Sequence, residues 1–164
     1  MSTCFWKFMN MDKHKPTSFL NMSSFVTFRL SKLQSSLNAQ ATSILKQNSD
    51  LTLVEWRIIQ VVRMFEDMTS SMIVDHVQMD KGQLSRKIKG MIEKGLLKSE
   101  RNQDDKRVQK LILTEKALSI SDMLMPTMEK RQKNLLSEVT PDELELFNGV
   151  IDKLEKASKK REIS

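Results

Sequence analysis

Apolar residues recur at helical spacing from Phe19 to Leu45, with Ser, Gln and Asn between them. The positions that repeat at steps of four and three are Val26, Leu30, Leu33, Leu37, Ala41 and Ile44. This spacing places them all on one face of a helix. The stretch therefore predicts a long amphipathic helix.

A second helix is predicted to begin after Thr52. Thr52 and Glu55 form a capping-box pattern, in which the hydroxyl accepts a backbone N–H bond and the carboxylate reaches back to the capping residue. The apolar positions that follow leave little polar face: Trp56, Ile58, Ile59, Val61, Val62 and Phe65. We therefore expect this helix to be the most buried of its domain.

Two shorter helices are predicted next, on either side of a tight turn. Thr69 is placed to cap the first, which ends just before Asp80. Asp80 and Gln83 form a second capping-box pattern for the helix that begins at Lys81. On this helix the positions expected to pack inward are Leu84, Ile88, Met91 and Ile92. The pattern is that of a helix–turn–helix.

A short β-hairpin is predicted to follow. Gly95 is expected to end the preceding helix, because glycine readily adopts the left-handed backbone conformation found just after a helix. Leu96–Arg101 and Val108–Leu113 have the length of strands, and Asn102–Arg107 is a polar tip between them. Together with the preceding helices, this order predicts a winged helix–turn–helix, mainly α with a small β-wing.

The C-terminal third is predicted to be helical again. Thr114 caps a long helix that Pro126 should kink or break, because proline lacks the N–H that an interior helical position donates. Thr140 and Glu143 form a third capping box, with Pro141 at the first helical position. The positions that the last helix is expected to bury are Leu144, Phe147, Ile151 and Leu154.

The positive charge is concentrated in the helix–turn–helix and the wing. The 164-residue chain has a net charge of +6, and residues 79–110 hold ten basic and five acidic residues. Almost the whole excess therefore lies where this fold meets a nucleic acid, and an acidic partner is expected.

The composition argues against several other classes. No apolar run approaches the roughly 20 residues that span a bilayer, so no membrane association is expected. Cys4 is the only cysteine, which excludes an intrachain disulfide and favours a reducing cytoplasm. His14 and His76 are too few and too far apart for a metal site built from His and Cys. Because there is also no Cys–His pair or glycine-rich phosphate loop, we expect neither an enzyme nor a cofactor.

Short motifs run through residues 51–117. They are Leu51-Thr52, Glu55-Trp56-Arg57, Met79-Asp80-Lys81, Leu84-Ser85-Arg86, Lys94-Gly95-Leu96, Arg101, Asp105-Lys106-Arg107 and Leu113-Thr114-Glu115-Lys116. In this order they resemble the MarR family of winged helix–turn–helix transcription regulators. The resemblance implies a homodimeric repressor that binds a pseudo-palindromic DNA operator and responds to a small-molecule effector.

The resemblance also implies a division of the chain. Residues 1–16 form an N-terminal extension, 17–50 an N-terminal dimerisation helix, 51–114 the DNA-binding domain and 115–164 the C-terminal dimerisation helices. A winged helix used as a protein-interaction module is the alternative. That module would show apolar anchors on the outer face of the second helix, where this sequence has polar and basic residues.

The expected DNA contacts come from three segments. The recognition helix supplies Lys81, Gln83, Ser85, Arg86, Lys87 and Lys89. Gln83 suits adenine and Arg86 suits guanine, whereas Lys87 and Lys89 suit phosphates. Phosphate contacts are also expected at a helix N-terminus from Thr69, Ser70 and Ser71. The wing supplies Arg101, Asp105, Lys106 and Arg107, and the resemblance implies that Arg107 enters the minor groove with Asp105 as its ion-pair partner.

The effector site is less well defined by the sequence. The resemblance and the Met-rich helices suggest Arg29, Trp56, Arg57, Met64 and Met123, with an arginine pairing an anionic ligand. Trp56 and the methionines are more simply explained as parts of a packed core. A redox role for Cys4 is disfavoured, because the related regulators that sense peroxide anchor the thiol with tyrosines and this chain has none.

Overall fold

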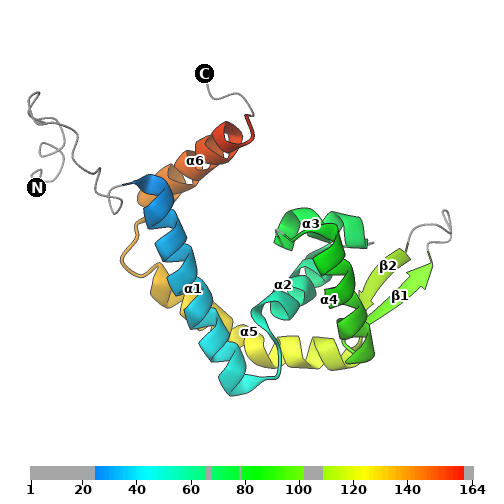
Figure 1. The fold of residues 1–164 in the computed structure, drawn as a ribbon. Helices are drawn as coiled ribbons and strands as arrows, with labels where there is room; N and C mark the ends of the chain where they lie inside the picture. Colours follow the sequence, from blue (N-terminus) through cyan, green and yellow to red (C-terminus); the bar gives the residue numbers. More distant parts are fainter. Residues whose placement is uncertain (1–24, 66–67, 78, 102–108, 161–164) are drawn as a thin grey trace, which may run out of the picture. The chain divides into compact units, whose positions relative to one another are not determined.

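The computed structural model describes residues 25–65, 68–77, 79–101 and 109–160. The chain divides into two units, residues 1–40 and 41–164. The elements are α1 (Val26–Asn48), α2 (Leu53–Met64), α3 (Ser70–Val77), α4 (Lys81–Glu93), β1 (Leu97–Arg101), β2 (Gln109–Leu113), α5 (Glu115–Leu135) and α6 (Pro141–Ser158) (Figure 1). The fold is mainly helical with one small antiparallel sheet, as the sequence predicts. None of the described helices is long and apolar enough to cross a membrane.

Helix α1 begins in the first unit and ends in the second. In the described part of the first unit, residues 25–40, no side chain is buried, and Phe25, Val26, Phe28 and Leu33 are exposed. The amphipathic stripe predicted from the spacing therefore lies on a helix, but its first half is uncovered. Only Ala41 and Leu45, both in the second unit, are buried.

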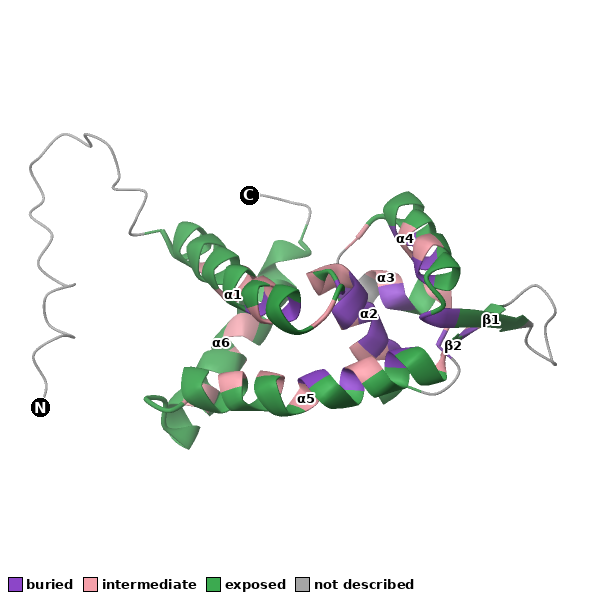
Figure 2. Ribbon diagram, turned by 90° about the horizontal axis from the view of Figure 1, so that it is seen from below, coloured by how far each residue is buried: buried purple, intermediate pink, exposed green. Residues whose placement is uncertain are grey.

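The core of the second unit is built around α2. Thr52 and Glu55 form both hydrogen bonds of the predicted capping box. Trp56, Ile58 and Ile59 are buried, as Figure 2 shows along this helix. Helix α2 contacts α3, α5 and β2, so its apolar surface faces neighbours on several sides. The prediction that this helix is deeply buried is confirmed.

The hairpin is tied to the helix–turn–helix. Strands β1 and β2 pair antiparallel with Leu97 opposite Leu113. The Leu111 N–H donates to the Met68 carbonyl at 2.8 Å, just before α3. The two strands begin and end within one residue of the predicted ones, and the predicted tip, residues 102–107, lies outside the described residues.

Helix α5 runs on through Pro126, so this residue does not break it. Thr114 caps α5 as predicted, and its hydroxyl also donates to the Gly95 carbonyl at 2.7 Å. Helix α6 begins with the predicted capping box and Pro141.

The expectation that α6 buries Leu144, Phe147, Ile151 and Leu154 is wrong for the single chain. No residue of α6 is buried, and Figure 2 shows most of this helix as exposed. Its apolar positions repeat as an amphipathic helix requires. The periodicity predicts an apolar face, but it does not say whether the same chain covers that face.

Candidate nucleic-acid interface

The recognition helix α4 is anchored at both ends. The Asp80 carboxylate accepts the Gln83 backbone N–H at 2.8 Å, which is the capping half of the predicted box. The reciprocal bond of a full box is not formed between these two described residues. At the other end Gly95 has φ 67°, and the N–H groups of Gly95 and Leu96 donate to the carbonyls of Ile92 and Met91, both at 2.9 Å. This is a Schellman motif, and it confirms Gly95 as the helix stop.

The inner face of α4 packs into the core. Leu84, Ile88 and Met91 are buried as predicted. Ile92 is 40% exposed, so the expectation that it packs inward is wrong. The helix closes with the Schellman turn just after this residue, and the chain then leaves toward β1.

The outer face of α4 is polar and basic. The exposed side chains on it are Lys81, Gln83, Ser85, Arg86 and Lys89. Lys89 lies 4.0 Å from Glu93 one turn on, a solvent-exposed pair that holds it only weakly. Amide and guanidinium groups on an exposed helix face are the donors and acceptors that read base edges in the major groove. Five of the six predicted recognition-helix residues therefore share one accessible surface.

Lys87, the sixth, lies against a buried carboxylate. Its Nζ is 4.0 Å from Glu55 Oε1 on α2, and Lys94 Nζ donates to the same oxygen at 2.8 Å. Burial raises the pKa of Glu55, but hydrogen bonds from Lys94 and Thr52 outweigh burial and bring the pKa below its ordinary value. The capping-box pattern predicts only the bond between Glu55 and Thr52. The one sign of a further role in the sequence is that the Glu55 carboxylate stands beside the apolar run of α2. This sign does not identify Lys87 or Lys94 as its partners.

The predicted phosphate contacts at the start of α3 lie beside the wing. Thr69 forms a β-bridge with Lys110 of β2. Its hydroxyl lies 3.0 Å from the Ser71 hydroxyl and accepts the Met72 N–H at 3.4 Å. Thr69 and Ser70 are half-buried and Ser71 is exposed. The N-terminus of α3 and the hairpin thus form one continuous edge.

Of the predicted wing residues, Arg101 lies in the part of the chain that the structure describes. Arg101 is the last residue of β1, paired in register with Gln109. Asp105, Lys106 and Arg107 lie outside the described residues. Their roles remain predictions from the resemblance.

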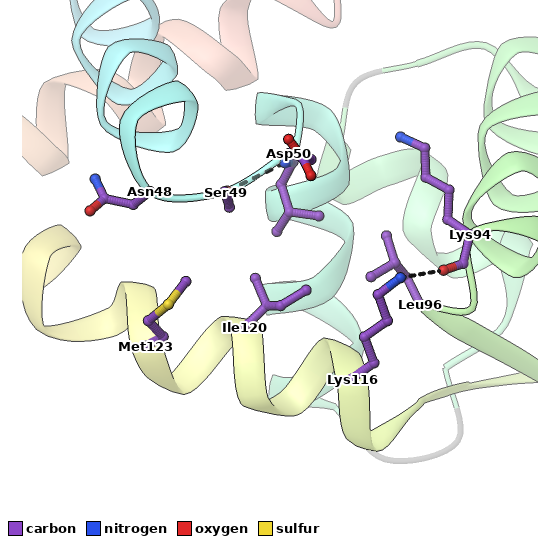
Figure 3. A pocket seen from close by; sticks show the side chains of 9 residues that line it. Asn48, Ser49, Asp50, Lys94, Leu96, Lys116, Ile120 and Met123 are labelled. Carbon is purple, nitrogen blue, oxygen red and sulfur yellow. Dashed lines mark hydrogen bonds between the residues drawn. The ribbon is translucent and has the colours of Figure 1, made fainter.

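A cavity of about 440 Å³ lies in the second unit between the end of α1, the turn that follows α4, and α5 (Figure 3). Its lining is Asn48, Ser49, Asp50, Leu51, Lys94, Leu96, Lys116, Ile120 and Met123. Lys116 Nζ donates to the Lys94 carbonyl at 2.9 Å, at the C-terminal end of the recognition helix. The cavity therefore combines apolar side chains with two lysines, Lys94 and Lys116, and one carboxylate, that of Asp50.

The residues suggested for an effector are spread over the structure. Met123 lines this cavity, whereas Trp56 belongs to the core and Arg57 is half-buried on α2. Met64 is 74% exposed at the end of α2, and Arg29 is exposed on the part of α1 in the first unit. The part of the chain that the structure describes holds no group of three His, Cys, Asp or Glu residues placed to bind a metal ion.

The chain has a helix–turn–helix on a shared core, a two-stranded wing and an exposed basic second helix. These features define the winged helix–turn–helix class of DNA-binding folds. Residues 49–108 match the model of the MarR family. This segment is therefore similar to the MarR family, and the chain has the winged helix–turn–helix fold of such transcriptional regulators.

Solved structures agree over most of the chain. A MarR/EmrR family transcriptional regulator from Acinetobacter sp. ADP1 is similar with 25% identity and a TM-score of 0.78, over 85% of this chain and 98% of that one. The PcaV transcriptional regulator from Streptomyces coelicolor, solved with its natural ligand, has 16% identity and a TM-score of 0.70, over 87% and 99%. MarR from E. coli in its apo form has 18% identity and a TM-score of 0.64, over 79% and 96%.

Proposed function

We propose that this chain is a homodimeric, sequence-specific transcription regulator that represses from a pseudo-palindromic operator in the cytoplasm. The observation that carries the proposal is the outer face of α4, where Gln83, Arg86 and Lys89 are exposed on a helix whose inner face is buried. A rigidly held helix with such side chains reads base edges, and the neighbouring lysines neutralise phosphates. The protein-interaction alternative has weaker support, because Ile92 at the end of the helix is the only exposed large apolar residue of α4.

The test uses DNA that the protein selects for itself. The wild-type chain is incubated with a randomised duplex pool, and the retained sequence is compared with a scrambled duplex of the same composition. We expect Arg86→Ala to weaken binding of the selected duplex by about tenfold or more, the effect of losing one base contact worth about 1–3 kcal/mol. Lys130→Ala, an exposed residue of α5, is the matched control and leaves binding unchanged. Equal binding by wild type and Arg86→Ala would remove this contact from the proposal.

Dimerisation is the second part of the proposal. Helix α6 carries exposed Leu146, Phe147, Val150 and Leu154, and the first unit separately exposes apolar residues of α1. Apolar helix faces of this kind are normally covered by a partner. A second copy would cover them and set two recognition helices about 34–36 Å apart, the spacing of successive major grooves.

The cavity of Figure 3 is the effector site that we propose. Its volume is within the range of about 300–1,000 Å³ that small-molecule sites occupy, and PcaV shows that a protein of this fold holds a ligand. An anionic group in the cavity would draw Lys116 away from the Lys94 carbonyl and so loosen the end of α4. Benzoate is a suitable first probe. We expect it to raise the melting temperature of the wild type but not of Ile120→Trp, whose larger side chain fills the cavity; equal shifts would exclude this cavity.

A further inference from the structure

We propose that Glu55 is a positioning residue that sets the orientation of the recognition helix toward DNA. This role rests on the DNA-binding function proposed above. It goes beyond the capping role that the sequence gives Glu55, because its carboxylate joins two helices that are almost 40 positions apart at their point of contact.

The two oxygens of the carboxylate serve different helices. Oε2 accepts the Thr52 N–H at 2.8 Å and so caps α2. Oε1 accepts Lys94 Nζ at 2.8 Å and lies 4.0 Å from Lys87 Nζ. One buried side chain therefore connects the start of α2 with the second half of α4.

Two attachment points on one helix restrict its rotation. Lys87 and Lys94 are seven residues apart, which is about two turns, so they lie on the same face of α4. Both ammonium groups converge on the same Glu55 oxygen, so a turn of α4 about its axis would lengthen both contacts. Lys116 adds a third tie by donating to the Lys94 carbonyl.

The reading residues share a surface with this connection. Glu55, Gln83, Arg86, Lys87 and Lys94 line one hollow beside α4. Because Gln83 and Arg86 sit next to the restrained face, rotation of the helix would move both of them relative to the base edges. The electrostatics support a permanent connection, since the lowered pKa of Glu55 keeps the carboxylate charged at neutral pH.

The variant that isolates this role is Glu55→Gln. Gln also serves at the third position of a capping box, so its carbonyl oxygen preserves the cap on α2 while the charge that holds the two lysines is lost. The matched control is Glu93→Gln, which makes the same change of charge on α4 at an exposed residue that pairs with Lys89. Lys94→Gln tests the other side of the connection, and it carries the test if Glu55→Gln fails to fold.

The readout is the ratio of affinities for the selected and the scrambled duplex. We expect Glu55→Gln and Lys94→Gln to lower this ratio by about tenfold, as expected when one base contact is misaligned. Binding of the scrambled duplex by Glu55→Gln should be unchanged or tighter, because the variant loses a negative charge near the phosphates. A purely structural defect would weaken both duplexes equally, and Glu93→Gln should leave the ratio at the wild-type value.

Two results would overturn the proposal, and they are distinguishable. A wild-type ratio in both Glu55→Gln and Lys94→Gln would remove the positioning role while leaving DNA binding in place. A wild-type protein with no preference between the two duplexes would remove sequence-specific binding itself, and the positioning role with it.

Discussion

The Glu55 carboxylate accepts a hydrogen bond on each of its two oxygens, from Thr52 and from Lys94. Its hydrogen bond to Thr52 is a local contact over three residues, and the capping pattern predicts it correctly. Its bond to Lys94 joins residues far apart in the chain and depends on how α4 packs on α2. The sequence pattern predicts the contact with Thr52, whereas the contact with Lys94 forms only in the folded chain.

The charge of Glu55 predicts a dependence of stability on pH. Because its pKa in the folded chain is below the ordinary value of 4.5, its contribution is fully present above that value and is lost as pH falls through the lowered pKa. We expect the difference in free energy of unfolding between wild type and Glu55→Gln to be largest near pH 7 and to shrink below pH 4.5. Urea unfolding of both proteins across this range measures it. A difference that stays constant with pH would contradict the ion-pair role.

Gly95 is a position where the backbone itself decides the residue. Its φ of 67° lies in the left-handed region, and a Cβ there would meet no atom within 4 Å. The cost of Gly95→Ala is therefore conformational, and we expect a loss of about 1–2 kcal/mol in unfolding free energy. Gly90→Ala, inside α4, is the control, because a Cβ there would also meet no atom within 4 Å and the change should stabilise the protein by about 0.5–1 kcal/mol. Effects of the same sign in both variants would be inconsistent with this explanation.

At the scale of elements, a small polar cluster joins α2 to α5. Ser121 is fully buried, and its hydroxyl accepts hydrogen bonds from Gln60 at 3.0 Å and Arg63 at 2.9 Å. Arg63 also pairs with Asp122 at 2.7 Å. These contacts give the α2–α5 packing a specific register that apolar contacts alone would not impose.

The cluster predicts the effect of removing its shared acceptor. Ser121→Ala should lower the free energy of unfolding by about 1 kcal/mol, because the hydrogen bonds from Gln60 and Arg63 are lost while both donors still reach solvent. Ser119→Ala on the same helix is exposed and should be neutral. Chemical denaturation of the two variants measures their free energies of unfolding. An unchanged free energy of unfolding in Ser121→Ala would show that the cluster adds nothing to stability.

At the scale of the whole molecule, α6 is the element whose environment the single chain does not complete. Leu146 is 71% exposed on a helix that buries none of its residues. We expect Leu146→Lys to shift the protein from dimer to monomer and to weaken binding of the selected duplex, since a monomer engages only one half-site. Sedimentation equilibrium and a DNA-binding titration measure the two effects.

The control for this change is Asn148→Lys. It introduces the same charge at an exposed polar position of the same helix. A dimer that survives Leu146→Lys as well as Asn148→Lys would mean that this face of α6 is not the interface.

The elements and their caps follow from local patterns in the sequence. The residues that end or cap helices act through hydrogen bonds or backbone angles within a few positions, so their patterns were sufficient to place the ends of the helices. These residues are Thr52, Asp80, Gly95, Thr114 and Thr140. The helical period likewise separated the inner from the outer face of α4, with Ile92 as the exception at its end. These are local properties, and local sequence encodes them.

Which surfaces and charges meet depends on how the elements pack. The packing places Glu55 beside Lys87 and Lys94. It places Gln60 and Arg63 within hydrogen-bond distance of Ser121. It also forms a cavity that Lys116 and Ile120 line on one side. It also left the apolar face of α6 uncovered, where the periodicity predicted burial. The physical reason is the same in each case: local patterns report caps and which residues share a face of a helix, but what meets that face depends on the packing of segments far apart in the chain.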